Sequence, residues 1–145
     1  MKYVLVSECL LGVNCRYDGK NSRCDALLET LKDCAIIPIC PEQLGGLTTP
    51  RPPAQINGGS GIDVLMKKAQ VLRVEDKVDV TEQYVKGAEA ALYLAKLFKA
   101  EEAYMKEKSP ACGVHFIKRG KEKVDGSGVC TALLQSEGLK IHSVE

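Results

Sequence analysis

The chain has 145 residues, with 20 basic and 19 acidic side chains and a formal net charge of +1. This length favours one domain, residues 1–145, with an ordinary hydrophobic core. The balanced charge gives no reason to expect a nucleic-acid or acidic-membrane surface. No apolar run has the length of a membrane span or the layout of a secretory signal, so we expect a cytoplasmic protein.

The first predicted element is a buried strand over residues 2–6, which are apolar and partly β-branched. A polar loop with an Asp18-Gly19 turn pair follows, and then a helix over roughly residues 24–32. A second apolar strand runs from residue 35 to Cys40. Cys9 and Cys40 therefore stand where the first two strands end.

The segment over residues 41–61 contains four prolines and five glycines. Because proline removes a backbone donor and fixes φ, we expect little regular structure here and interpret the segment as a functional loop. Residues 58–61 lack the phosphate-binding GxxxxGK[ST] pattern and are interpreted as a flexible connector.

The second half of the chain alternates helices and strands. A short strand is predicted over residues 71–74, and an apolar stripe predicts a helix from about residue 79 to residue 98. A strand over residues 103–105, a helix over residues 129–136 and a strand over residues 139–144 complete the pattern. Strands separated by helices favour parallel βαβ units. The predicted fold class is α/β, a single domain with a mainly parallel, Rossmann-like sheet flanked by helices.

Seven cysteines are present. In a reducing compartment they favour metal binding or catalysis over disulfides, and an odd number cannot pair completely. Cys24, Cys34 and Cys130 are interpreted as small apolar residues. Cys9, Cys40 and Cys112 each follow a predicted strand, and ligands bind outside the carboxyl ends of parallel strands. The sequence therefore predicts a site at this edge of the sheet.

Two interpretations of these cysteines remain open. The close Cys-x2-Cys pairs typical of zinc sites and ferredoxins are absent, so the three thiols could be unrelated. Three thiolates from three strand ends could instead hold three irons of a cubane cluster and leave the fourth iron open as a Lewis acid. Such a chain could also be a metal or cluster module without catalysis, or a metal-free thiol enzyme that uses Cys9 or Cys112.

Several neighbouring side chains suit catalysis or ligand binding. Glu42 follows Cys40 closely and is a candidate general base on water, although a solvated loop glutamate is the commoner role. Ser109 could contact a substrate or satisfy the local backbone. Arg16, Tyr17 and Arg51 are candidates for positioning a planar or anionic ligand, with a packing role for Tyr17 equally open.

Taken together, three motifs resemble those of a known family. They are Cys9–Gly12 with Arg16–Gly19, Cys40–Glu42 with Gly45–Leu47, and Lys108–Gly113. The chain resembles, over nearly its full length, short microbial proteins formerly classed as a domain of unknown function. The characterised members of that family are iron–sulfur thiouracil desulfidases.

The resemblance implies a 4Fe–4S cluster held by Cys9, Cys40 and Cys112, whose open iron binds the sulfur of 4-thiouracil. It further implies that Glu42 activates a water, that Ser109 assists proton movement, and that uracil and sulfide form without net electron transfer. The expected partner is a small thiolated nucleobase or nucleoside. Cys15 departs from the pattern we expect in relatives and is either a spare thiol or a rival ligand.

Overall fold

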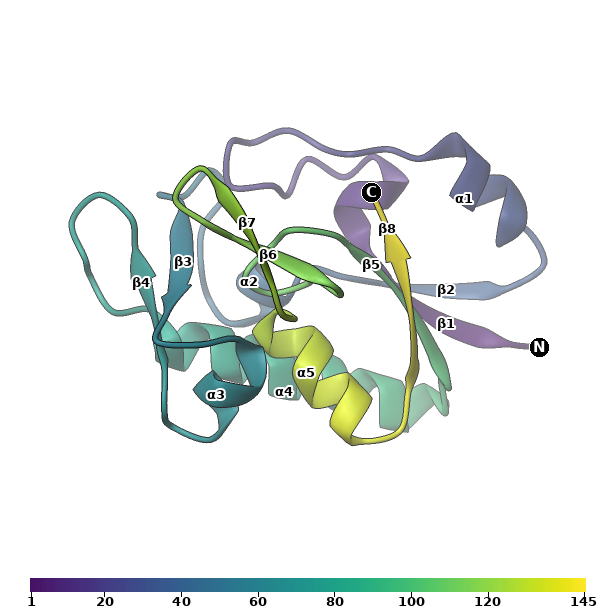
Figure 1. Ribbon diagram of the computed structural model, residues 1–145. Coiled ribbons are helices and arrows are strands. Elements are labelled where there is room, and N and C mark those ends of the chain that lie inside the picture. The colour runs from purple at the N-terminus through teal and green to yellow at the C-terminus, as the bar shows by residue number, and fades with distance from the viewer.

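The computed structural model describes residues 1–145 and is built on a central four-stranded sheet (Figure 1). All neighbouring strands of this sheet are parallel, which confirms the α/β class and the parallel sheet. In spatial order the strands are β2 (Ala35–Ile39), β1 (Tyr3–Ser7), β5 (Glu102–Lys106) and β8 (Lys140–Val144). No helix of the chain is both long enough and apolar enough to cross a membrane.

The chain winds away from β1 in two directions. It first crosses through α1 (Asp25–Thr30) to β2 on one side. It later returns through α4 (Thr81–Phe98) to β5 on the other side of β1, and through α5 (Val129–Ser136) to β8. The strand order therefore reverses between β1 and β5, and the crevice at the carboxyl ends of such a pair is where α/β sheets bind ligands.

The two faces of the sheet are covered differently. Leu5 of β1 packs into the larger core with residues of α4 and α5, while its neighbours Val4 and Val6 face a smaller core with Leu27 of α1. Figure 1 shows α1 on the opposite side of the sheet from α4 and α5. This alternation follows from the period-two geometry of a strand that is buried on both faces.

The proline-rich segment is more ordered than its composition predicts. It forms α2 (Pro41–Leu44), β3 (Ala54–Asn57) and the start of α3 (Gly61–Leu65). Pro41 occupies the first helical turn, where its missing N–H is not needed. Residues 58–60 connect β3 to α3, and Ser60 and Asp63 form a capping box at the start of that helix.

Two antiparallel hairpins stand beside the main sheet. β3 pairs with β4 (Gln70–Arg73), and β6 (Phe116–Arg119) pairs with β7 (Glu122–Asp125). The second hairpin was not predicted, because its strands are short and carry more charged than apolar side chains. It follows directly on the loop that carries Cys112.

Helices α2 and α4 touch through their backbones. A Cβ atom on Gly87 of α4 would lie 1.8 Å from the carbonyl oxygen of Pro41, and one on Gly45 would lie 1.9 Å from that of Gln83. Only glycine allows this approach. It brings Tyr84, one turn before Gly87, against Glu42 of α2.

Candidate active site

Cys9, Cys40 and Cys112 are buried at the carboxyl edge of the sheet. Cys9 lies in the 3-10 helix η1 (Glu8–Leu11) directly after β1, and Cys40 caps α2 directly after β2. Cys112 lies in the loop after β5. The structure thus places these cysteines at one edge of the sheet from three distant parts of the sequence.

Cys15 belongs to the same group of thiols. It is buried, and its Sγ lies within 4.8 Å of the Cys40 Sγ. Interaction with Cys15 lowers the pKa of Cys9 and Cys40, against the opposing effect of burial. Two local features turn the loop after η1 toward the cysteines. Gly12 adopts φ +101°, and the Cys15 N–H donates to the Val13 carbonyl at 2.8 Å.

The Cys112 loop is fixed by hydroxyl groups on both sides. The Ser109 Oγ accepts the backbone N–H groups of Ala111 at 3.0 Å and Cys112 at 3.1 Å. The Thr131 hydroxyl, in α5, donates to the Cys112 carbonyl at 2.8 Å. Because Ser109 uses its oxygen as an acceptor, its own O–H hydrogen is left to donate. Burial raises the pKa of the Cys112 thiol well above its usual range.

A buried carboxylate, Glu107, holds the chain beyond Cys112. Its side chain is 1% exposed and accepts the N–H groups of Val114 at 2.6 Å, His115 at 3.0 Å and Phe116 at 3.1 Å. The Ser143 hydroxyl of β8 donates to its other oxygen at 2.6 Å. Although burial opposes ionisation, these donors hold the pKa of Glu107 at about 2. Glu107 therefore secures the loop that positions Cys112.

Glu42 is held at both carboxylate oxygens. Its Oε1 lies 3.2 Å from the Arg51 Nη2, and its Oε2 accepts the Tyr84 hydroxyl at 2.9 Å. The Glu42 side chain is 12% exposed. Burial raises the pKa of Cys112 and Cys130, and the negative charge of Glu42 raises both further. Burial, together with Glu42, raises the pKa of the Tyr84 phenol well above its usual range. The carboxylate thus faces the cysteines in a fixed orientation.

Arg16, Tyr17 and Arg51 lie on the same side of this edge. The Arg51 N–H donates to the Tyr17 carbonyl at 2.9 Å, and the Tyr17 side chain is exposed. The Arg16 guanidinium donates to Ser22 at 3.0 Å, and its charge acts on Cys9. The Arg51 Nε is a buried polar atom without a hydrogen-bond partner, which leaves a donor for a ligand.

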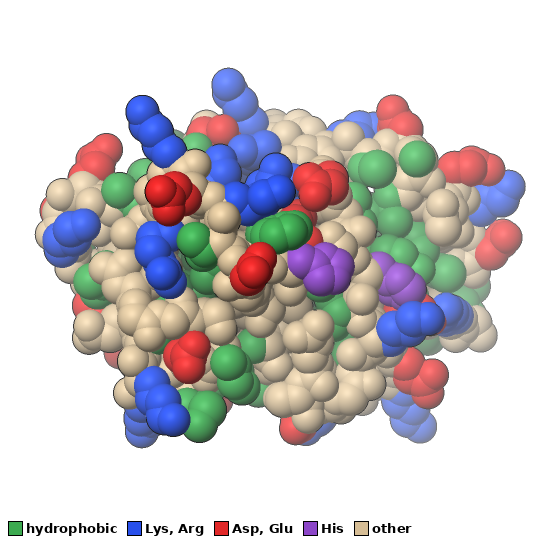
Figure 2. All heavy atoms as spheres, in the orientation of Figure 1, with side chains coloured by type: hydrophobic (Ala, Val, Ile, Leu, Met, Phe, Trp, Pro, Cys, Tyr) green, Lys and Arg blue, Asp and Glu red, His purple; other side chains and the backbone are tan.

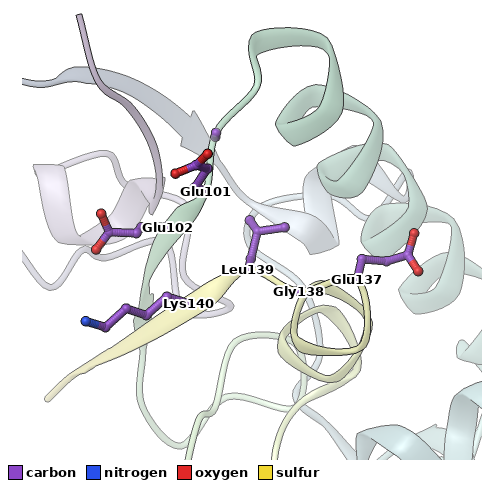
Figure 3. Close-up of a pocket in the computed structure, with 7 residues that line it drawn as sticks. Glu101, Glu102, Glu137, Gly138, Leu139 and Lys140 are labelled. Atoms are coloured by element: carbon purple, nitrogen blue, oxygen red, sulfur yellow. The ribbon is translucent and has the colours of Figure 1, made fainter.

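A surface hollow lies at the other edge of the sheet (Figure 3). It measures about 500 Å³ and is lined by residues at or just before the starts of β5 and β8, among them Glu101, Glu102 and Lys140. None of the predicted site residues lines it. Figure 2 shows acidic and basic side chains interspersed over the face in view, without a large field of one sign.

Sequence reasoning missed the residues that brace the site. Tyr84 lies in the apolar stripe that predicts the helix over residues 79–98. Its phenolic hydroxyl was the available signal for a role at the site, because a buried tyrosine needs a polar partner. Glu107, the acid nearest before the Lys108–Gly113 motif, and Thr131 were not considered. The two histidines are peripheral: His115 lies beside Glu107, and His142 stacks on Tyr104 with 4.3 Å between ring centroids.

The chain is similar to known proteins over nearly its whole length. A family model described as 2-thiouracil desulfurase matches residues 4–145. A Bacillus subtilis (strain 168) protein, described as uncharacterized protein YbbK, is 41% identical over 143 residues, which cover 97% of this chain and 94% of the relative. The solved structure of the [4Fe-4S]-dependent thiouracil desulfidase TudS is 35% identical, with a TM-score of 0.82 over 99% of this chain and 91% of its own. The chain therefore belongs to the 2-thiouracil desulfurase family.

Proposed function

We propose that this chain is a single desulfidase-like domain, residues 1–145, that converts 4-thiouracil and water into uracil and sulfide without net electron transfer. The observation that carries the proposal is the placement of three buried thiols at the carboxyl ends of neighbouring strands, together with one braced carboxylate. The family match and the likeness to TudS support it. Seven free cysteines suit a reducing compartment, and we propose that the protein acts in the cytoplasm.

The donor set fits an iron–sulfur cluster. Thiolates are the usual ligands of such clusters, and all three thiols are buried at the same edge of the sheet. We propose that Cys9, Cys40 and Cys112 hold a 4Fe–4S cluster. When bound, the cluster supplies an iron without a protein ligand, which can act as a Lewis acid toward the sulfur of the substrate.

Glu42 is proposed as the general base. The Arg51 guanidinium stabilises its negative charge, and the Tyr84 hydroxyl fixes one oxygen, so further lone-pair positions on the carboxylate remain available. Glu42 accepts a proton from water as the water oxygen forms its bond to the ring carbon that loses sulfur. The C–S bond breaks with its electron pair on sulfur, which leaves as sulfide.

Ser109 and the neighbouring polar residues are proposed to handle the substrate. The Ser109 hydroxyl is held by two backbone N–H groups and donates its own hydrogen toward the reacting centre. The exposed ring of Tyr17 offers a face for a planar pyrimidine, and Arg16 lies beside it. The unpartnered Arg51 Nε offers a hydrogen bond to the carbonyl oxygen of the base.

The test is an anaerobic assay of reconstituted protein with 4-thiouracil, 2-thiouracil and 4-thiouridine as separate substrates. We expect uracil and sulfide in equal amounts from 4-thiouracil, without added reductant, and no turnover by apoprotein. Iron-loaded protein that is inactive on all three substrates would indicate a binding module instead. Active, metal-free protein would indicate a thiol enzyme.

A further inference from the structure

Two residues that the proposed reaction does not use lie against Cys40. A carboxylate oxygen of Glu8, the Cys15 Sγ and the Cys40 Sγ all lie within 4.8 Å of one another. The two cysteines are buried, whereas Glu8 is partly exposed. The three donors thus form a group of ligand atoms in which Glu8 is the member that solvent reaches.

The backbone holds these donors in place. The N–H of Val13 bonds the Glu8 carbonyl at 3.2 Å, which folds the chain after η1 back over its own start. The Asn21 amide donates to the Asn14 side chain at 2.8 Å and ties the same loop to the segment before α1. The Cys40 thiol in turn approaches the Cys15 carbonyl at 3.9 Å. The group is therefore assembled by the fold.

The chemistry of the donors selects one class of ion. Two thiolates and one carboxylate suit a divalent transition metal such as Zn²⁺, while Mg²⁺ and Ca²⁺ prefer oxygen alone. Two sulfurs on one tetrahedral zinc lie about 3.8 Å apart, because each Zn–S bond is about 2.3 Å long. The donor atoms lie within 4.8 Å of one another, so side-chain shifts of about 1 Å or less bring them to that spacing.

We propose that, in the absence of a cluster, the chain binds one Zn²⁺-class ion through Glu8, Cys15 and Cys40. Because Cys40 serves both sites, this ion and the cluster exclude each other. The exclusion rests on the proposed function, but the ion site itself does not.

The ion site is tested with Co²⁺, a spectroscopic substitute for Zn²⁺, on reduced apoprotein under anaerobic conditions. We expect one Co²⁺ per chain, thiolate-to-cobalt charge-transfer absorption, and displacement by Zn²⁺. Cys15→Ser should weaken Co²⁺ binding more than about 100-fold, since loss of an outer-shell partner alone costs 10–100-fold. Glu8→Gln, a change at a partly exposed residue with little risk to folding, should weaken it about tenfold.

Cys112→Ser is the matched control. It removes a proposed cluster ligand that is not part of the ion site, so Co²⁺ binding should stay at the wild-type level, with circular dichroism confirming a folded chain. Unchanged Co²⁺ affinity in both Cys15→Ser and Glu8→Gln, or an equal loss in Cys112→Ser, would overturn the ion site.

Competition tests the exclusion separately. Equimolar Zn²⁺ should block iron and sulfide uptake by wild-type apoprotein and should have little effect on Cys15→Ser. Simultaneous retention of Zn²⁺ and a full cluster by the wild type would overturn the exclusion and leave the ion site standing. Desulfuration is not measured in either experiment, so failure of the proposed reaction would not be mistaken for failure of the ion site.

Discussion

Strand β5 has a glutamate at each end, and the two are used differently. Glu102 begins the strand at the amino edge, where Lys2 and His142 hold its pKa at about 2. Glu107 follows the strand at the carboxyl edge, and its pKa is also about 2, but its partners are the N–H groups of the Cys112 loop and Ser143. The same residue type with the same pKa thus makes partly buried ion pairs at one edge and organises a cysteine loop at the other.

The largest contrast between the two edges is expected in cluster retention. Replacing Cys9, Cys40 or Cys112 by serine removes a proposed ligand at the carboxyl edge, so iron and acid-labile sulfide should fall to near background. Cys34, just before β2 at the amino edge, is the control, and Cys34→Ser should keep the wild-type content. Iron and sulfide analysis after anaerobic reconstitution measures both. A full cluster in any of the first three variants would remove that residue from the ligand set.

The next contrast separates holding the cluster from using it. Glu42→Gln preserves size but removes the proton-accepting oxygen, so turnover should fall by about 10²–10⁴-fold with iron content unchanged. Glu101→Gln, in the hollow at the amino edge, is the control and should leave turnover unchanged. Single-turnover release of uracil is the measurement. Near-normal release from loaded Glu42→Gln would show that Glu42 is only a support for α2.

The two ends of β5 can be compared directly by stability. Glu107→Gln should lower the free energy of unfolding by about 2–3 kcal/mol, because it leaves buried N–H groups facing an amide. Glu102→Gln should cost less than about 1 kcal/mol, as exposed ion pairs do. Since the pKa of Glu107 is depressed, its contribution is present above about pH 4.5 and is lost as the pH falls toward 2.

Urea unfolding of the apoprotein from pH 7 to pH 3 checks both statements. The wild type should lose stability over the acid range, and Glu107→Gln should show a shallower dependence on pH. Equal destabilisation by the two substitutions would contradict the difference between the edges.

The smallest expected effect concerns how Glu42 is oriented. Tyr84→Phe removes one hydrogen bond to the carboxylate, while Arg51 still holds the other oxygen, so turnover should fall about tenfold. Iron content and the melting temperature should change little, which separates orientation from folding. An unchanged turnover number would show that Arg51 alone orients Glu42.

The regular parts of the fold could be predicted because their patterns are local. The apolar stripe of α4 and the apolar run of β2 were sufficient for those elements, and the bounds of α5 agree with the prediction. The α2 helix and the β6–β7 hairpin were missed because they depend on tertiary contacts. A four-residue helix that begins at Pro41 is stabilised by packing on α4, which no local pattern reports.

The site was predicted as a set of residue types and a shared edge. The sequence did not predict the residues that hold the site residues in place. Tyr84 contacts Glu42 across 42 positions, and Ser143 contacts Glu107 across 36, so neither pair leaves a short motif. Cys15 was left open as a spare thiol or a rival ligand, and the structure places its Sγ within 4.8 Å of the Cys40 Sγ.

The strand order has a consequence for the timing of assembly. Glu8, Cys15 and Cys40 all leave the ribosome before β5, which pairs with β1 in the finished sheet. Cys112 comes later still. During synthesis, every ligand of the proposed ion site therefore exists before the third thiol of the proposed cluster site does. A cluster held by all three thiols can be inserted only after Cys112 has been made, and until then the preceding cysteines are exposed to whichever metal the cell supplies.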